Sequence, residues 1–143
     1  MLFWEKLRSF STLYEKITDP VKEQYHLTQM EFDILMFLHN NPTYKTANDM
    51  VRVRHLTKSH VSASVTSLEK KGLLEGSFAE GNRKSIQLTL TPAADEIVSA
   101  GKVAQTAYAD ALTQGFTQAE KDEFRELFLR MCANADAEIE RRA

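Results

Sequence analysis

Apolar side chains recur at helical spacing over much of the chain, which predicts a mainly helical protein. The first apolar stripe runs from Leu2 to Ile17. We expect this helix to end at Asp19-Pro20, because the residue before a proline avoids helical backbone angles. Residues Thr28 to Glu31 form a capping box, which predicts the start of a second helix. This second helix is expected to stop at Asn40-Asn41-Pro42.

Two further helices are expected before the first glycine of the chain. Thr46 is in position to cap a short helix, after which the chain is expected to turn at Val53 to His55. Thr57 is the expected cap of the next, longer helix. Its core face is given by apolar residues at positions i, i+4 and i+7, namely Val61, Val65 and Leu68. Gly72 ends this helix, since glycine accepts the left-handed geometry common at helix C-termini.

The spacing becomes strand-like after this glycine. Leu73 to Phe78 predicts one strand, and Ala79 to Lys84 predicts a polar turn. A second strand follows, in which apolar residues alternate with polar ones: Ile86, Leu88 and Leu90. Together the two strands predict a hairpin.

The last third of the chain is again helical. Thr91-Pro92 starts a helix that runs to about Gln114, and the capping box from Thr117 to Glu120 opens the last one. The last helix carries an apolar stripe of Phe124, Leu127, Phe128, Met131 and Ile139. Three helices followed by a hairpin predict a winged helix-turn-helix over residues 28–92. The outer helices, residues 1–20 and 93–143, also carry apolar stripes. The winged helix is too small to cover these stripes, so we expect the outer helices to form a homodimer interface.

Charge is distributed unevenly along the chain. Of the 143 residues 43% are apolar and 27% are charged, with a formal net charge of −2, which is an ordinary globular composition. From Arg52 to Lys71 five basic residues stand against one acid, so this segment carries +4 and the remainder −6. Such a basic island is the electrostatic pattern expected of a phosphate-binding surface. A basic helix face that contacts only solvent is the alternative.

The helix that follows Thr57 supplies a candidate DNA-reading face. Opposite its core residues lie small and hydroxyl-bearing side chains, which allow a close approach to the floor of the major groove. This face consists of Ser59, Ser62, Ala63, Thr66 and Lys70, and it is flanked by His60 and Ser67. Lys58 and Lys70 are expected to contact phosphates from its two ends. The alternative is a polar face without a partner.

Three segments resemble the MarR family of bacterial transcriptional regulators. LTKSHVSASVTSLEKKGLL, residues 56–74, is similar to the family's recognition helix and the strand after it. LTLTPAAD resembles the family's strand-to-helix junction, and LTQMEFDILMFLHNNP resembles its second helix. The resemblance covers nearly the whole chain and implies a single MarR-like domain over residues 1–143.

The resemblance also implies a function. It suggests a cytoplasmic homodimer that binds double-stranded DNA at a pseudo-palindromic operator and represses transcription. It further implies that the protein releases DNA when a small effector binds in a pocket between the dimer helices and the winged helix. This effector is expected to be an aromatic or lipid-like molecule of unknown identity. An aromatic stripe in the first helix is expected in the dimer core or at this pocket: Phe3, Trp4, Phe10 and Tyr14.

The wing departs from the family pattern. The family has an Asp-x-Arg motif eight residues before a leucine, and its aspartate orients the arginine that enters the minor groove. Counting back from Leu90, those two positions hold Asn82 and Lys84, with Arg83 between them. Asn82 cannot form the ion pair and Lys84 lacks the planar fork of arginine, so either Arg83 or Lys84 is expected in the minor groove. A plain hairpin turn is the alternative.

Other kinds of site have less support in the sequence. The four histidines do not have metal-ligand spacing, and no catalytic motif is present, so neither an enzyme activity nor a cofactor is expected. Cys132 is expected to be a small buried residue, with an oxidant-sensing regulator as the alternative. A winged helix that binds protein instead of DNA is a further alternative, because the wing motif is substituted.

Overall fold

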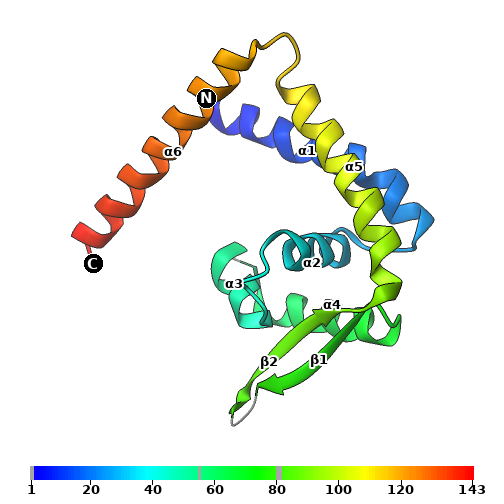
Figure 1. The fold of residues 1–143 in the computed structure, drawn as a ribbon. Helices are drawn as coiled ribbons and strands as arrows, with labels where there is room; N and C mark the ends of the chain where they lie inside the picture. The colour runs from blue at the N-terminus through cyan, green and yellow to red at the C-terminus, as the bar shows by residue number, and fades with distance from the viewer. Residues whose placement is uncertain (1, 55, 80–81) are drawn as a thin grey trace. The chain divides into compact units, whose positions relative to one another are not determined.

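The computed structural model describes residues 2–54, 56–79 and 82–143, and the side chains of Leu2 and of residues 79–85 lie outside this description. Two compact units are formed, residues 1–108 and residues 109–143. The elements, shown in Figure 1, are α1 (Leu2–Gln24), α2 (Gln29–Asn40), α3 (Ala47–Arg54), α4 (Lys58–Lys70), β1 (Leu74–Ala79), β2 (Asn82–Leu90), a short 3-10 helix η1 (Pro92–Ala94), α5 (Asp95–Leu112) and α6 (Gln118–Arg141). The predicted fold class, mainly helical with one hairpin, is confirmed.

The core of the first unit is built around α2. Seven of its residues are buried, so this helix is enclosed on more than one side. It contacts α1, α4 and β2. Phe32 and Leu35 of α2 are 0% exposed, as are Val61 and Leu68 of α4. The capping box predicted at Thr28 is present, because the hydroxyl of Thr28 accepts the amide N–H of Glu31 at 3.1 Å and the Glu31 carboxylate accepts that of Thr28 at 3.0 Å.

The predicted end of the first helix at Asp19-Pro20 is wrong. Pro20 lies inside α1, which continues to Gln24. Proline removes one backbone donor, but Val21 and Leu27 beyond it are buried, at 9% and 8% exposure, and their packing outweighs the lost bond. The chain leaves α1 at His26, which has a left-handed φ of 54°. There the amide of Leu27 donates to the carbonyl of Lys22 at 2.8 Å, which closes the helix end.

The turn predicted at Val53 to His55 is also partly wrong, because α3 continues through Arg54, while His55 lies outside the described residues. Thr46 caps α3 as predicted, and its hydroxyl accepts the amide of Asp49 at 3.0 Å. Thr57 stands at the N-cap position of α4 but its side chain makes no capping hydrogen bond there. Gly72 ends α4 with φ 72°, as expected.

The hairpin is longer than predicted. Strand β2 begins at Asn82, so the polar turn expected from Ala79 to Lys84 is shorter than the sequence indicated. Leu74 pairs with Leu90 and Phe78 with Ile86 in the antiparallel register. The N–H of Leu88 also donates to the carbonyl of Lys45 at 2.6 Å, so the loop before α3 joins the edge of the hairpin. This bond fixes the base of the hairpin against the helices.

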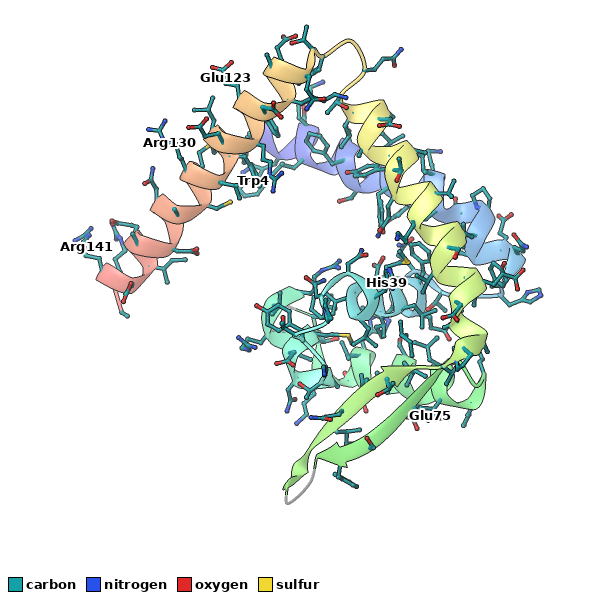
Figure 2. The ribbon with its side chains drawn as sticks, viewed as in Figure 1. Trp4, His39, Glu75, Glu123, Arg130 and Arg141 are labelled. Carbon is teal, nitrogen blue, oxygen red and sulfur yellow. The ribbon has the colours of Figure 1, made fainter. Side chains whose placement is uncertain are left out.

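The second unit consists of the end of α5, a short turn and α6. The predicted capping box of α6 is present between Thr117 and Glu120. No residue of α6 is buried, and its apolar stripe is exposed: Phe124, Leu127, Phe128, Met131 and Ile139. Cys132 is exposed too, which contradicts its expected burial. The side chains of Glu123 and Arg130 project from the polar edge of this helix (Figure 2).

Gly101 of α5 lies directly against buried side chains of α2. A methyl group at this position would lie 2.5 Å from the sulfur of Met36 and 3.1 Å from the ring of Phe32, both of which are buried. We expect Gly101→Ala to lower the free energy of unfolding by about 1 kcal/mol, since overpacking of about 2 kcal/mol exceeds the gain of about 1 kcal/mol in helix propensity. Urea denaturation measures this change. Ser99→Ala, on the exposed side of α5, is the control, and a gain in stability for Gly101→Ala would contradict the close approach.

Candidate nucleic-acid interface

Helix α4 separates a buried face from an exposed one. Val61, Val65 and Leu68 are 0%, 8% and 0% exposed, as their spacing predicted. The opposite face is open along the whole helix, and the exposed residues of α4 are Lys58, Ser59, His60, Ser62, Ala63, Thr66, Glu69 and Lys70. Small side chains predominate in its middle and lysines stand at its two ends. This surface is narrow enough to enter a groove and has cations at both rims.

Ser67, predicted at the flank of this face, is directed inward. Its hydroxyl donates to the carboxylate of Glu31 at 2.9 Å and its side chain is half-buried. The hydroxyl of Thr66 donates to the carbonyl of Ser62 at 3.0 Å, one turn earlier in the same helix. Ser67 therefore belongs to the contact between α4 and α2, whereas Thr66 stays on the exposed face.

Glu31 holds the C-terminal end of α4 in place. Its side chain is buried, and its carboxylate accepts hydrogen bonds from the Thr28 amide, from Ser67 and, at 2.9 Å, from the ammonium of Lys71. Lys71 also donates to the carbonyl of His26 at 2.8 Å. Burial by itself would raise the pKa of Glu31, but the hydrogen bonds from Lys71, Thr28 and Ser67 outweigh it and lower the pKa.

These contacts divide the basic island of the sequence into paired and unpaired cations. Lys71 is paired with Glu31, and Arg52 is paired with Asp49 at 3.0 Å while lying over the ring of Tyr44. Among the described residues no salt bridge involves the other three basic residues of the island, which are Arg54, Lys58 and Lys70. Positive charge available to a ligand is thus concentrated at the end of α3 and at the two ends of α4.

A groove of about 190 Å³ lies between α4, the start of α3 and the hairpin. Lys58, Val61 and Ser62 line it from α4, and Ile86 lines it from β2. The remaining lining residues come from the N-terminal side and first turns of α3: Thr46, Ala47, Asn48 and Val51. Two residues of the exposed face of α4 therefore also form one wall of a groove against the wing.

The residues predicted for minor-groove contact lie at the start of β2. Asn82, Arg83 and Lys84 are in this strand, but their side chains lie outside the described part of the structure. Their role stays a prediction.

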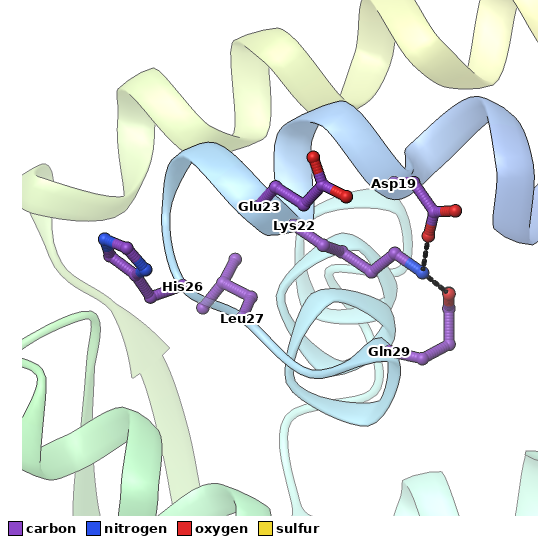
Figure 3. Close-up of a pocket in the computed structure, with 6 residues that line it drawn as sticks. All are labelled: Asp19, Lys22, Glu23, His26, Leu27 and Gln29. Atoms are coloured by element: carbon purple, nitrogen blue, oxygen red, sulfur yellow. Dashed lines mark hydrogen bonds and ion pairs between the residues drawn. The ribbon is translucent and has the colours of Figure 1, made fainter.

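A second, polar hollow of about 430 Å³ lies where α1 meets α2 (Figure 3). Lys22 crosses it and binds the carboxylate of Asp19 at 2.8 Å as well as the side-chain oxygen of Gln29. His26 lies at one end and contributes the carbonyl that receives Lys71. Within the described residues no cluster of histidine, cysteine and carboxylate side chains is suited to hold a metal ion. None of the described helices has the length and hydropathy needed to cross a bilayer.

We expect Glu31→Gln to lower the free energy of unfolding at neutral pH by about 2 kcal/mol, because the variant loses the charged hydrogen bonds. A carboxylate whose pKa is lower in the folded state stabilises the fold above its unfolded-state pKa, and this contribution is lost as the pH falls through the folded-state value. The difference between wild type and Glu31→Gln should therefore narrow as the pH falls below about 4.5. Urea denaturation across this pH range measures it, with exposed Glu69→Gln as the control. An equal difference at all pH values would refute the assignment.

Comparisons with known proteins point to one family. Residues 26–85 match the sequence profile of the MarR family, which spans α2 to the start of β2. The crystal structure of MarR is 20% identical over 94% of this chain and 91% of that chain, with a TM-score of 0.78. A search among curated protein sequences found no match.

Two further solved structures have the same fold. A putative MarR family transcriptional regulator from Listeria monocytogenes, complexed with 26mer DNA, is 16% identical over 92% of this chain and 87% of that one, with a TM-score of 0.80. BpsR of Bordetella bronchiseptica is 20% identical over 92% of this chain and 99% of that one, with a TM-score of 0.71. The DNA binding of BpsR is regulated by 6-hydroxynicotinic acid. At these identities the likeness is one of fold.

Proposed function

We propose that the chain is a DNA-binding repressor of the MarR family, whose profile matches residues 26–85, and that it acts as a homodimer on a pseudo-palindromic operator. The observation that carries the proposal is the exposed face of α4. Ser59, Ser62 and Ala63 form its small centre, while Lys58 and Lys70 stand at its ends. A helix of this kind brings hydroxyls to base edges and cations to the phosphates on either side.

The individual side chains have separate roles in this proposal. Lys58 and Lys70 bind phosphates and add affinity for any DNA sequence. Ser59, Ser62 and Ala63 approach the bases, so they determine which sequence is preferred. His60 and Thr66 stand beside them on the same exposed face, and Arg83 or Lys84 of the wing enters the neighbouring minor groove. Base recognition then depends on close approach of the helix more than on arginine side chains.

Removal of one phosphate contact has a measurable consequence. We expect Lys58→Ala to weaken binding to every duplex and to reduce the slope of log affinity against log salt concentration by about 0.9, because one fewer counterion is released. Fluorescence anisotropy with a labelled duplex over a range of salt concentrations gives both quantities. Lys102→Ala, which removes an exposed lysine of α5, is the matched control.

An unchanged salt slope in Lys58→Ala would remove Lys58 from the phosphate-binding set. Failure of the wild-type protein to bind any duplex would contradict the whole proposal. That second result would favour a winged helix that binds another protein.

Dimerisation is proposed from the uncovered apolar surfaces of the outer helices. In α6, Phe124 and Phe128 are 60% and 51% exposed, and their rings stack 6.0 Å apart. In α1, Phe3 and Trp4 are 58% and 66% exposed. Large exposed apolar patches of this kind are unusual in monomers and typical of interfaces between subunits. A two-fold dimer also matches the symmetry of a palindromic operator.

We expect Phe128→Asp to raise the dimer dissociation constant at least about tenfold, since a charge would be placed in the apolar interface. Sedimentation equilibrium of the full chain measures this constant. Glu126→Ala, on the opposite side of α6, is the control and should leave association unchanged. A wild-type protein that is monomeric at micromolar concentration would overturn the dimer.

Response to a small effector is the remaining part of the proposal. Aromatic side chains of α1 meet α5 within the first unit, where the rings of Tyr14 and Tyr108 lie 5.1 Å apart and edge to face. Gln105 donates to the hydroxyl of Tyr14 at 3.0 Å. These groups offer stacking and hydrogen bonding to an aromatic ligand. Regulation of DNA binding by 6-hydroxynicotinic acid in BpsR supports an effector of this class.

A further inference from the structure

We propose that Phe78 and Ile86 form an apolar wall on the wing that packs against the deoxyribose edges of one DNA strand, while Lys58 on the facing wall binds the phosphates of the same strand. This inference rests on the proposed DNA-binding function and specifies the path of the strand between α4 and the hairpin.

The apolar face of the hairpin extends beyond the core that it covers. Leu74 and Leu88 lie on this face near its base and are 1% and 4% exposed. Further out on the same face, Ile86 is 46% exposed and its cross-strand partner Phe78 is 57% exposed. Side chains two residues apart on a strand point to the same side, so the buried and exposed members form one continuous row. The outer pair is the part of this row that the described protein leaves uncovered.

Ile86 lies between this apolar pair and α4. It lines the 190 Å³ groove together with Lys58 and Ser62 of α4. The absence of a side chain at Gly76 permits this position, because a methyl group there would lie 2.9 Å from Cγ2 of Ile86. The same methyl group would lie 3.2 Å from the carboxylate of Glu69, so this part of β1 also packs closely against the end of α4. The groove thus has an apolar wall at Ile86 and a cationic, hydroxyl-bearing wall at Lys58 and Ser62.

A DNA strand matches this distribution of chemistry. Its sugars present apolar C–H edges, its phosphates are anionic, and the two alternate along the backbone. Lys58 then binds a phosphate, Ser62 bonds to the backbone or to a base edge, and the apolar pair covers the sugars. An apolar protein surface would fit Phe78 and Ile86 but would leave Lys58 without a partner.

The test separates an apolar contact from an ionic one. The probe is a duplex that the wild-type protein enriches from a randomised pool. We expect Phe78→Ser to weaken binding about fivefold to tenfold at every salt concentration, with an unchanged log–log salt slope, because no counterion is released by a phenyl ring. Phe78→Leu should retain most of the affinity. Ser77→Ala, on the opposite face of the same strand, is the control.

Hydroxyl-radical footprinting reports on the sugars directly, because these radicals cleave DNA by removing deoxyribose hydrogens. Sugars protected by the wild-type protein beside the α4 contact should become reactive with Phe78→Ser, while thermal denaturation shows the variant to be folded. Wild-type affinity and footprint in Phe78→Ser would overturn this inference alone and leave the pair available to a protein partner. Absence of any duplex binding by the wild type would overturn the proposed function, and this inference with it.

Discussion

The buried carboxylate of Glu31 holds the C-terminal end of α4 against α2. Removing a charge from water is costly unless its hydrogen-bonding capacity is filled, and Glu31 fills it with groups from two separate segments. The amide of Thr28 fixes the start of α2, Ser67 and Lys71 fix the end of α4, and Lys71 extends the network to the carbonyl of His26. The end of α4 nearest Lys70 is therefore held by an ionic contact, and the exposed face of the helix keeps a defined direction.

Features encoded by neighbouring residues were predictable from the sequence. The capping box at Thr28, the glycine end of α4 and the core face of α4 all depend on residues within a few positions of one another, and the structure confirms them. The continuation of α1 past Pro20 was missed, because it depends on the tertiary packing of Val21 and Leu27, and local backbone preference opposes it. The inward direction of Ser67 was missed for a related reason, since its partner lies 36 residues earlier in the chain.

The pairing of the charged residues was missed in the sequence as well. A count along the sequence treats the cations from Arg52 to Lys71 as one basic surface, but their partners Asp49 and Glu31 lie before this segment and neutralise two of them. Three cations remain: Arg54 at the end of α3, and Lys58 and Lys70 at the two ends of a small, hydroxyl-rich face of α4. This arrangement suits phosphates on both sides of a groove better than a uniformly basic patch does, because the centre of the helix stays free of long side chains.

The hairpin shows why an alternating pattern predicts which face of a strand is apolar, but predicts less well how deeply each side chain is buried. Which side of a strand is apolar follows from a period of two, whereas the depth of each side chain depends on how far the rest of the domain extends beneath the strand. Strand β2 has nine residues and extends beyond the helices that its base covers. The same row of apolar side chains is therefore buried at Leu88 and exposed at Ile86. Apolar residues are also exposed along α6, whereas on the wing Ile86 lines a groove together with Lys58 and Ser62. The neighbouring polar groups, more than the apolar residues themselves, distinguish a surface for protein from a surface for DNA.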